Sequence, residues 1–485
     1  MAGADSRHDY RQAQEAWVTG HTGSSTAVAL AHSLLVVVLS AVVARLAAAS
    51  LDRRQAGTYT RHLGLELVLS AGPMWLALCW PEWNATALAA LGALGLALLA
   101  DNAGAVFGRP TPEADAARLQ ALNHPRKLAL SHLRAGLLLS TCIAILAVDY
   151  AIFPRSFAKT ENYGISVMDA GVGCFVFIGA VSSARWARLD QEHDAPAGVP
   201  LARRLGDLLR AVWSAWPLLL LGFGRLLAVR STGYQEHASE YGRHWNFFFT
   251  LGAVPALVTL ATAVCRPGRF VWLLAGLLPV WQWLLTGSPG PAAELAITGG
   301  LPAPEWVPWV VGQNREGLVS LAGYLAMALA GARAAVALFT PRPSVAAWRR
   351  VALDLLGASA LCWAGYFLLS EVLGLDPSRR VANPAYALWI VAAMLLAVGA
   401  LLLAETVLPA PGGSTAGGPL ARALTRNQLA LFLAANVSTG LVNLTTRTLD
   451  ASPAVGRLAM LAYTAWLLGL AVLLDRGLDV TLRWW

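Results

Sequence analysis

The chain has 485 residues, of which 56% are hydrophobic and 13% are charged, and its formal net charge is +8. Its mean hydropathy is +0.54. A soluble domain carries about 25% charged residues, so this chain has too little charge to cover a globule with polar surface. The composition excludes an ordinary soluble globular protein and predicts a protein that lies in lipid.

Thirteen apolar stretches approach the roughly 20 residues that a helix needs to cross the hydrocarbon. They predict an all-α polytopic membrane protein with about 13 transmembrane helices and short loops. We expect one membrane domain over 26–485 and a polar segment over 1–25 that is not a cleavable leader. The predicted helices cover 26–49, 64–81, 85–106, 128–150, 167–184, 208–229, 246–264, 270–286, 317–339, 350–375, 385–407, 428–446 and 455–475.

Basic residues indicate the direction of these helices. Most of the 36 Lys and Arg lie in the loops after odd-numbered helices and in the C-terminal tail, as Arg126, Arg203 and Arg349 do. Because positive loops stay in the cytosol, the N-terminus is expected to be lumenal and the C-terminus cytosolic. This bias explains the net positive charge. No basic patch is interleaved with aromatic residues, so a nucleic-acid partner is not expected.

The cysteines and histidines do not indicate a metal site. The five cysteines lie in or beside apolar runs without a CxxC pair, which is typical of small apolar filler. His237 and His244 are seven residues apart, but the segment matches no zinc spacing. Three glycosylation sequons lie on or near the predicted lumenal side, two of them in or beside a helix, so their use stays open. They begin at Asn84, Asn436 and Asn443.

Three predicted lumenal segments combine acids, bases and aromatic residues beside the membrane boundary: 147–169, 233–249 and 314–317. A polar residue at membrane depth must face protein or water, so such clusters predict a functional site. The residues expected to bind substrate there are Arg155, Glu161, Tyr163, Asp169, Gln235, Glu236, Trp245, Asn246, Asn314, Arg315 and Glu316.

Two charged residues of the first segment are candidates for catalysis. Lys127 and Lys159 are the only lysines of the chain, and Lys159 lies in the densest polar loop, which favours a need for a compact ammonium over chance. Asp149 closes an apolar helix, where a carboxylate meets the unfavourable end of the helix dipole. Arg155 or Lys159 could compensate its charge. Asp169 could instead be a helix cap.

The other two segments allow similar alternatives. His237 and His244 would share one helix face and suit proton transfer or hydrogen bonding to a polar substrate. Trp245 and the phenylalanines 247–249 are either an interfacial belt or the wall of an acyl-chain groove. Arg315 lies just before a predicted helix, where it could belong to a charged first turn or help to hold a phosphate.

Several longer motifs carry a resemblance to a known family. They are ILAVDYAIFPRSFAKTENYG, MDAGVGCFVF, STGYQEHASEYGRHWNFFFT and NREGL, with SRRVANPAYALWI near 378–390 and TRNQLALFLAANVSTGLVNL near 425–444. In this order and spacing they resemble the PIG-W family, the inositol acyltransferases of glycosylphosphatidylinositol (GPI) anchor synthesis. Departures occur at Tyr150, Ser156 and Thr425. The missing second arginine at position 156 puts a phosphate contact there in doubt.

The resemblance implies transfer of a fatty acyl group, usually palmitoyl, from acyl-CoA to the inositol 2-hydroxyl of glucosaminyl-phosphatidylinositol in the endoplasmic reticulum membrane. It implies that Asp149 and Lys159 are catalytic, with acyl-CoA as a co-substrate and no tightly bound cofactor. Asp149 is the expected base, and His237 or His244 is the second choice. No Ser or Cys in these motifs has a nucleophile's setting, which favours direct transfer.

The competing interpretation is a proton-coupled transporter of lipids or small molecules, because Asp, Lys and His near the membrane would suit proton transfer. Paired halves with matching interrupted helices would favour it, and the sequence does not show them. The expected partners of the acyltransferase are its acceptor lipid and acyl-CoA, with no obligate protein partner.

Overall fold

The structure is a computed structural model that describes residues 9–10, 12–14, 16–17, 28–193, 199–232, 244–286, 308–408 and 418–482. In this part of the chain the regular elements are helices. The main ones are α2 (Val28–Arg53), α3 (Tyr59–Glu66), α4 (Gly72–Cys79), α5 (Asn84–Asp101), α6 (Ala103–Phe107), α7 (Pro112–Asn123), α8 (Leu128–Ala147), α9 (Ala170–Val181), α10 (Arg185–His193), α11 (Leu201–Trp213), α12 (Trp216–Thr232), α14 (Phe247–Ala261), α15 (Phe270–Thr286), α17 (Trp309–Gln313), α18 (Arg315–Phe339), α19 (Val345–Phe367), α20 (Pro384–Val407), α21 (Pro419–Arg426), α22 (Gln428–Thr445) and α23 (Pro453–Val472).

Shorter turns extend or join these helices. Single π-helical turns lie at Leu67–Ala71, Leu368–Val372 and Leu473–Gly477. The first of them joins α3 to α4, and the other two extend the C-terminal ends of α19 and α23. The 3₁₀ turns are Pro81–Trp83, Arg155–Phe157, Pro267–Arg269 and Thr448–Asp450.

Local sequence explains where several helices begin. The side chains of Asn246, Ser344, Asn383 and Ser452 each accept a hydrogen bond from a backbone N–H of the helix that follows. Ser and Asn are preferred at this position because their short side chains satisfy N–H groups that have no partner inside the helix. The apolar runs behind these caps then continue as helices.

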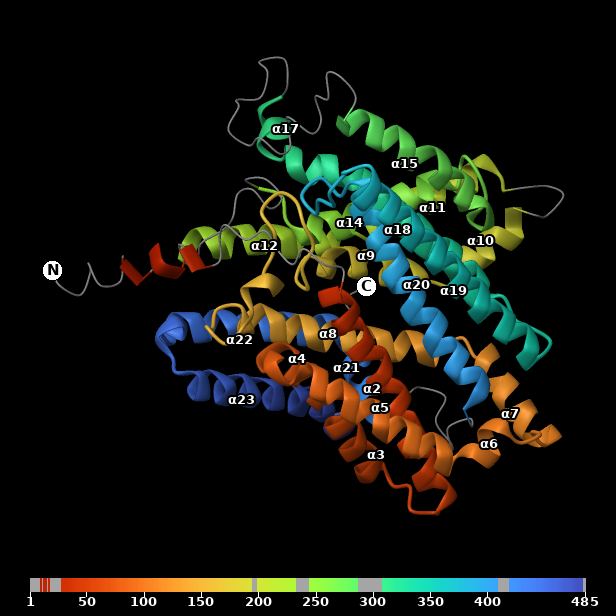
Figure 1. Cartoon of the computed structure of the whole chain (residues 1–485). Coiled ribbons are helices and arrows are strands. Elements are labelled where there is room, and N and C mark those ends of the chain that lie inside the picture. The colour runs from red at the N-terminus through yellow and green to blue at the C-terminus, as the bar shows by residue number, and fades with distance from the viewer. Residues whose placement is uncertain are drawn as a thin grey trace.

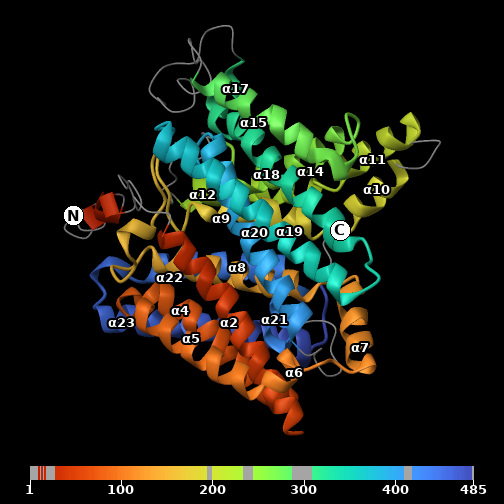
Figure 2. The same ribbon diagram turned by 45° about the vertical axis from the view of Figure 1, so that its right-hand side comes forward.

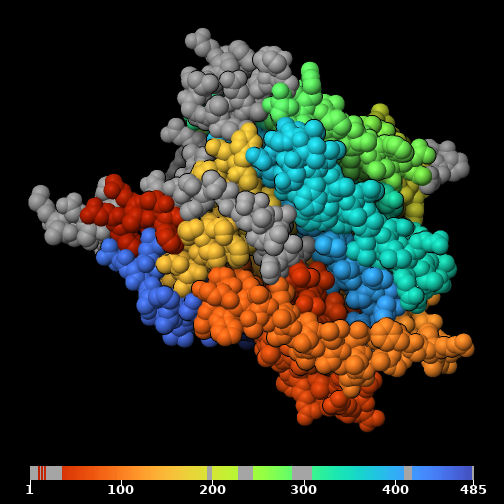
Figure 3. Space-filling view, in the orientation of Figure 1, coloured from red at the N-terminus to blue at the C-terminus, as the bar shows by residue number. Residues whose placement is uncertain are grey.

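Three helices form the centre of the fold. In the most apolar stretch of each helix, 72% of the residues of α20 and 61% of those of α8 and of α18 are buried within the protein. For the span that contains α5 the share is 11%. Figures 1 and 2 show α2–α5, α22 and α23 together on one side of α20 and α10–α18 on the other. Helices α5 and α19 make much of the face in Figure 3. Their exposed apolar side chains suit contact with lipid.

The predicted helical class is confirmed, and the expected number of spans is not. In the described residues ten helices are long and apolar enough to cross a membrane, or eleven if α9 and α10, bent by 54°, form one span. Helix α9 has 12 residues, α14 has 15, and α11 and α12 are separate helices in place of one predicted span. A hydropathy window cannot detect these interruptions, because it averages over them.

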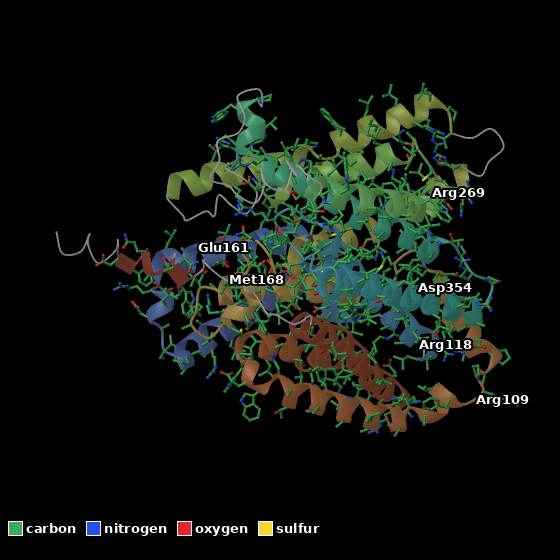
Figure 4. All side chains as sticks on the ribbon, turned by 45° about the horizontal axis from the view of Figure 1, so that its top comes forward. Arg109, Arg118, Glu161, Met168, Arg269 and Asp354 are labelled. Atoms are coloured by element: carbon green, nitrogen blue, oxygen red, sulfur yellow. The ribbon has the colours of Figure 1, made fainter. Side chains whose placement is uncertain are left out.

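The first polar segment and the positively charged loops lie at different ends of the bundle. Figure 4 shows Glu161 and Met168 toward one end, and Arg109, Arg118, Asp354 and Arg269 toward the other. The first pair belongs to the first of the three polar segments. The second group lies in or beside the loops after odd-numbered predicted helices. The structure thus separates the polar segment from these loops along the bundle.

Candidate active site

Asp149 lies in the turn that follows α8, where its backbone N–H donates to the carbonyl of Leu146 at 3.2 Å. Its Oδ2 accepts a hydrogen bond of 2.7 Å from Nδ2 of Asn443 in α22. Burial raises the pKa of the Asp149 carboxyl to about 6, against the Asn443 hydrogen bond and the charge of Arg155, which both lower it. A carboxylate with a pKa near the working pH can both hold and release a proton, as a general base requires.

Asn443 was not predicted as a site residue. Asn443 begins a glycosylation sequon in the sequence, and only the fold brings it to Asp149, 294 positions earlier. Its Oδ1 is buried and, within the described residues, accepts no hydrogen bond. Asn443 therefore positions the carboxylate with one end of its amide and presents an acceptor beside it with the other.

Arg155 organises the turn around Asp149. Its guanidinium donates to the carbonyl oxygens of Val148 and Trp17 at 3.0 Å each, and it lies 3.8 Å from the centre of the Trp17 ring. It therefore satisfies a carbonyl at the C-terminal end of α8 and ties the N-terminal segment to the site. The positive charge of Arg155 also lowers the pKa of the Asp149 carboxyl.

Asp169 is fully buried at the start of α9 and holds the loop that carries Lys159. Its carboxylate pairs with Nε of Arg379 at 2.7 Å, and both of its oxygens lie 3.2 Å from the backbone nitrogen of Thr160. Arg379 also donates to the carbonyl of Thr160 at 3.4 Å. Because Thr160 is held on both sides of its main chain, the position of its neighbour Lys159, which is partly buried, is set by this ion pair.

A second buried ion pair joins the same loop to the third polar segment. Glu316, 5% exposed, lies 3.3 Å from Nη2 of Arg380 and 3.6 Å from Nε of Arg315. Arg380 also donates to Oδ1 of Asn162 at 2.7 Å. Tyr163 is 45% exposed next to it, and Glu161 is partly buried. Arg379 and Arg380 belong to the SRRVANPAY stretch that carries part of the family resemblance, and they were not predicted as site residues.

The second polar segment packs directly on the third. The backbone N–H of His244 donates to Oδ1 of Asn314 at 2.9 Å. Trp245 covers Gly317 so closely that a Cβ there would lie 2.3 Å from the indole ring. Asn246 caps α14 through Phe248 at 3.1 Å. Trp245, Asn246 and Asn314 thus position the backbone here. The predicted residues Gln235, Glu236 and His237 lie outside the described residues.

The three polar segments therefore meet: Arg380 joins the first to the third through Asn162 and Glu316, and the His244–Asn314 hydrogen bond joins the second to the third. Nearby, Phe175 of α9, Phe247 of α14 and Phe432 of α22 pack together with ring centres 6.0 to 6.5 Å apart. In the part of the chain that the structure describes, no three His, Cys, Asp or Glu residues are grouped so as to hold a metal ion. Asp149 is the candidate base of this region, and its described partners are Asn443 and Arg155.

The fold defines a polytopic membrane protein in which three polar segments of the chain come together. Comparison with known proteins identifies the family. A family model described as GWT1 matches residues 10–474. GPI-anchored wall transfer protein 1 of Aspergillus fumigatus is 37% identical over 374 residues, which are 72% of each chain. The protein of the same name from Aspergillus oryzae is 39% identical over 376 residues, again 72% of each chain.

A relative from a mammal is similar in the same way. Glucosaminyl-phosphatidylinositol-acyltransferase PIGW of Bos taurus is 35% identical over 349 residues, 64% of this chain and 66% of that protein. The chain belongs to the GWT1 family, and the resemblance found in its motifs is confirmed. The predicted enzyme class, an acyltransferase, is confirmed with it.

Proposed function

We propose that this protein transfers a palmitoyl group from acyl-CoA to the inositol 2-hydroxyl of glucosaminyl-phosphatidylinositol in GPI-anchor synthesis. The observation that carries the proposal is the partly buried Asp149 carboxylate, which accepts a hydrogen bond from Asn443. The PIGW relatives of this chain are named for acyl transfer to this lipid. These relatives favour acyl transfer over the transporter interpretation.

The proposed step is a direct attack on the thioester. Asp149 accepts the proton of the inositol hydroxyl while the hydroxyl oxygen bonds to the thioester carbonyl carbon. The C–S bond then breaks, the ester remains on inositol, and the thiolate leaves and takes up a proton. Proton abstraction by a positioned base typically contributes about 10²–10⁴-fold to the rate. The raised pKa of Asp149, about 6, leaves the carboxyl mostly ionised at pH 7.

Lys159 is the proposed cation beside the developing negative charge on the carbonyl oxygen. The buried pair Asp169 and Arg379 keeps the loop in place through Thr160, so that the ammonium is positioned before the reaction. Removing one such stabilising donor in known enzymes costs about 2.7–4 kcal/mol of transition-state stabilisation. His237 and His244 remain the second choice for the base.

The site is proposed to face the lumen of the endoplasmic reticulum. In support, Glu161 lies toward one end of the bundle, and Arg109, Arg118 and Arg269 lie toward the other (Figure 4). Positive loops stay in the cytosol, which puts the end with Glu161 on the lumenal side. Ser156 is exposed in this loop. A cysteine at position 156 should react with an impermeant label only after sealed vesicles are opened, and labelling of intact vesicles would reverse the orientation.

The function is tested with membranes that contain the protein, isotopically labelled palmitoyl-CoA and glucosaminyl-phosphatidylinositol. Mass spectrometry should show a lipid that gained one labelled palmitoyl group, with fragments that place the group on the inositol ring. Absence of this product, or an acyl group on the glucosamine, would contradict the proposal. Labelled acyl recovered on the denatured protein would contradict direct transfer.

A further inference from the structure

A second polar region lies at the other end of α8 from Asp149. Here the structure contains a cavity of about 530 Å³, a size typical of small-molecule sites. Its wall comes from the start of α8, from α21 and from the π-helical turn after α23. The charged residues that line it are Arg126, Lys127, Arg134, Arg422, Arg426 and Asp475.

The charges of this cavity do not balance. Five cations line it, and Asp475 is the one lining acid in the part of the chain that the structure describes. Asp475 is 3% exposed and already binds Arg422 at 2.8 Å and Arg426 at 3.1 Å. Asp479, at the surface, adds a second contact of 2.7 Å to Arg426. Even with Asp479 counted, five cations face two carboxylates, so the region has an excess of three positive charges.

Lys127 is the most unusual of these cations. It is 8% exposed, its ammonium donates to the carbonyl of Leu122, and it lies 4.5 Å from the centre of the Trp348 ring. Burial lowers the pKa of Lys127 to about 8. Glu405, whose charge reaches Lys127, lies 3.8 Å from Arg45. A buried cation is costly unless an anion compensates it, and the cavity beside Lys127 has room for one.

The cations come from separate parts of the chain and converge. Arg134 is oriented by two hydrogen bonds to Oε1 of Gln428, at 3.0 and 2.7 Å. Ser131 and Thr425 also line the cavity, and their hydroxyls donate to the backbone carbonyls of Lys127 and Ala421. Planar guanidinium groups bind phosphate oxygens in pairs. Several convergent cations are the donor set that a group with more than one phosphate charge requires.

We propose that this cavity binds a phosphate-bearing ligand, with Arg126, Lys127 and Arg134 as its contacts. Two sources share this chemistry: the nucleotide end of a coenzyme thioester and the headgroup of an anionic lipid. Fifteen residues separate Arg134 from Asp149, about 22 Å at 1.5 Å per helical residue, so this site is distinct from the candidate active site. The proposal stands whether or not Asp149 is the base.

The first test measures binding of desulfo-coenzyme A, which cannot transfer an acyl group, to the full chain in phosphatidylcholine nanodiscs. Binding should weaken as salt rises, and Arg126→Gln and Lys127→Gln should each weaken it about tenfold, as expected for a lost charged hydrogen bond. Arg349→Gln is the matched control, because Arg349 is an exposed arginine that does not line the cavity. Its affinity should equal that of the wild type.

The second test addresses the lipid source. Native mass spectrometry should show phosphatidylinositol retained by the wild type and by Arg349→Gln and lost from the double variant Arg126→Gln/Arg134→Gln. If phosphatidylinositol is retained and desulfo-coenzyme A does not bind, the ligand is the lipid headgroup. If desulfo-coenzyme A binds and the cavity variants weaken this binding as expected, the ligand is the nucleotide end of the coenzyme. If both probes treat the cavity variants and the control alike, the proposal is overturned. Arg126 is exposed, so its single variant keeps the test valid if Lys127→Gln fails to fold.

Discussion

Nδ2 of Asn443 donates a hydrogen bond of 2.7 Å to Oδ2 of Asp149, and this contact connects α22 to the turn after α8. A hydrogen bond to the ionised form of a carboxyl stabilises that form and lowers its pKa. Asn443 thus opposes the effect of burial, which raises the pKa of Asp149 to about 6. Together the two effects keep the carboxyl ionised and basic near neutral pH.

Asn443→Ala should move the acid limb of the pH profile of kcat/KM to higher pH. The base works only when ionised, so activity falls as pH decreases through its pKa, and loss of the hydrogen bond raises that pKa. A charged hydrogen bond of about 1.5–3 kcal/mol corresponds to about 1–2 pH units. Asn436→Ala is the control, because Asn436 donates to Phe432 within its own helix. An acid limb that does not move in Asn443→Ala would exclude this role.

Asp169→Asn should lower the thermal unfolding midpoint strongly, because it leaves Arg379 buried without its carboxylate. Breaking a buried pair from one side typically costs about 3–5 kcal/mol. The double variant Asp169→Asn/Arg379→Gln should recover part of this loss. If Asp169→Asn unfolds at the same temperature as the wild type, the Asp169–Arg379 pair does not hold the Lys159 loop.

Gly317→Ala should separate the second and third polar segments. The added Cβ would lie 2.3 Å from the Trp245 ring, so the tryptophan must move. Overpacking typically costs about 1–3 kcal/mol, and this cost should appear as a lower thermal unfolding midpoint. Gly276→Ala, where no atom lies within 4 Å of the added Cβ, is the control and should be neutral or stabilising. Equal effects of the two substitutions would contradict the packing argument.

Lys159→Arg should lose most acyl transfer even though the positive charge remains, since a guanidinium is larger and planar where a compact ammonium is proposed. The loss should appear in kcat, with an unchanged unfolding midpoint. Arg349→Lys is the control, because it also exchanges lysine and arginine but at an exposed position. Full activity of Lys159→Arg would mean that any cation serves at this position.

The sequence predicted most helices, because hydropathy depends on local composition. It did not predict the bend between α9 and α10 or the short α14, which depend on how these helices pack. It also missed Asn443, Arg379 and Arg380. Their roles require contacts across 294, 210 and 64 positions, which no local pattern encodes.

The basic cavity shows the same limit. The rarity of lysine in the chain predicted a role for Lys159, which lies in the densest polar loop. Lys127 was counted only among the basic residues of the positive loops. Only the packing of α21 and the turn after α23 against the start of α8 brings Arg422, Arg426 and Asp475 beside it. A charge pattern along the chain indicates the side of the membrane, and the fold decides which of those charges converge.

The most direct test of the central claim is the rate of acyl transfer by Asp149→Asn in membranes, compared with Asp354→Asn. Asp354 is an exposed aspartate toward the opposite end of the bundle (Figure 4). We expect Asp149→Asn to reduce kcat at least about 100-fold at an unchanged unfolding midpoint and Asp354→Asn to retain the wild-type rate. An Asp149→Asn enzyme with a rate within a few fold of the wild type would contradict the assignment of Asp149 as the base.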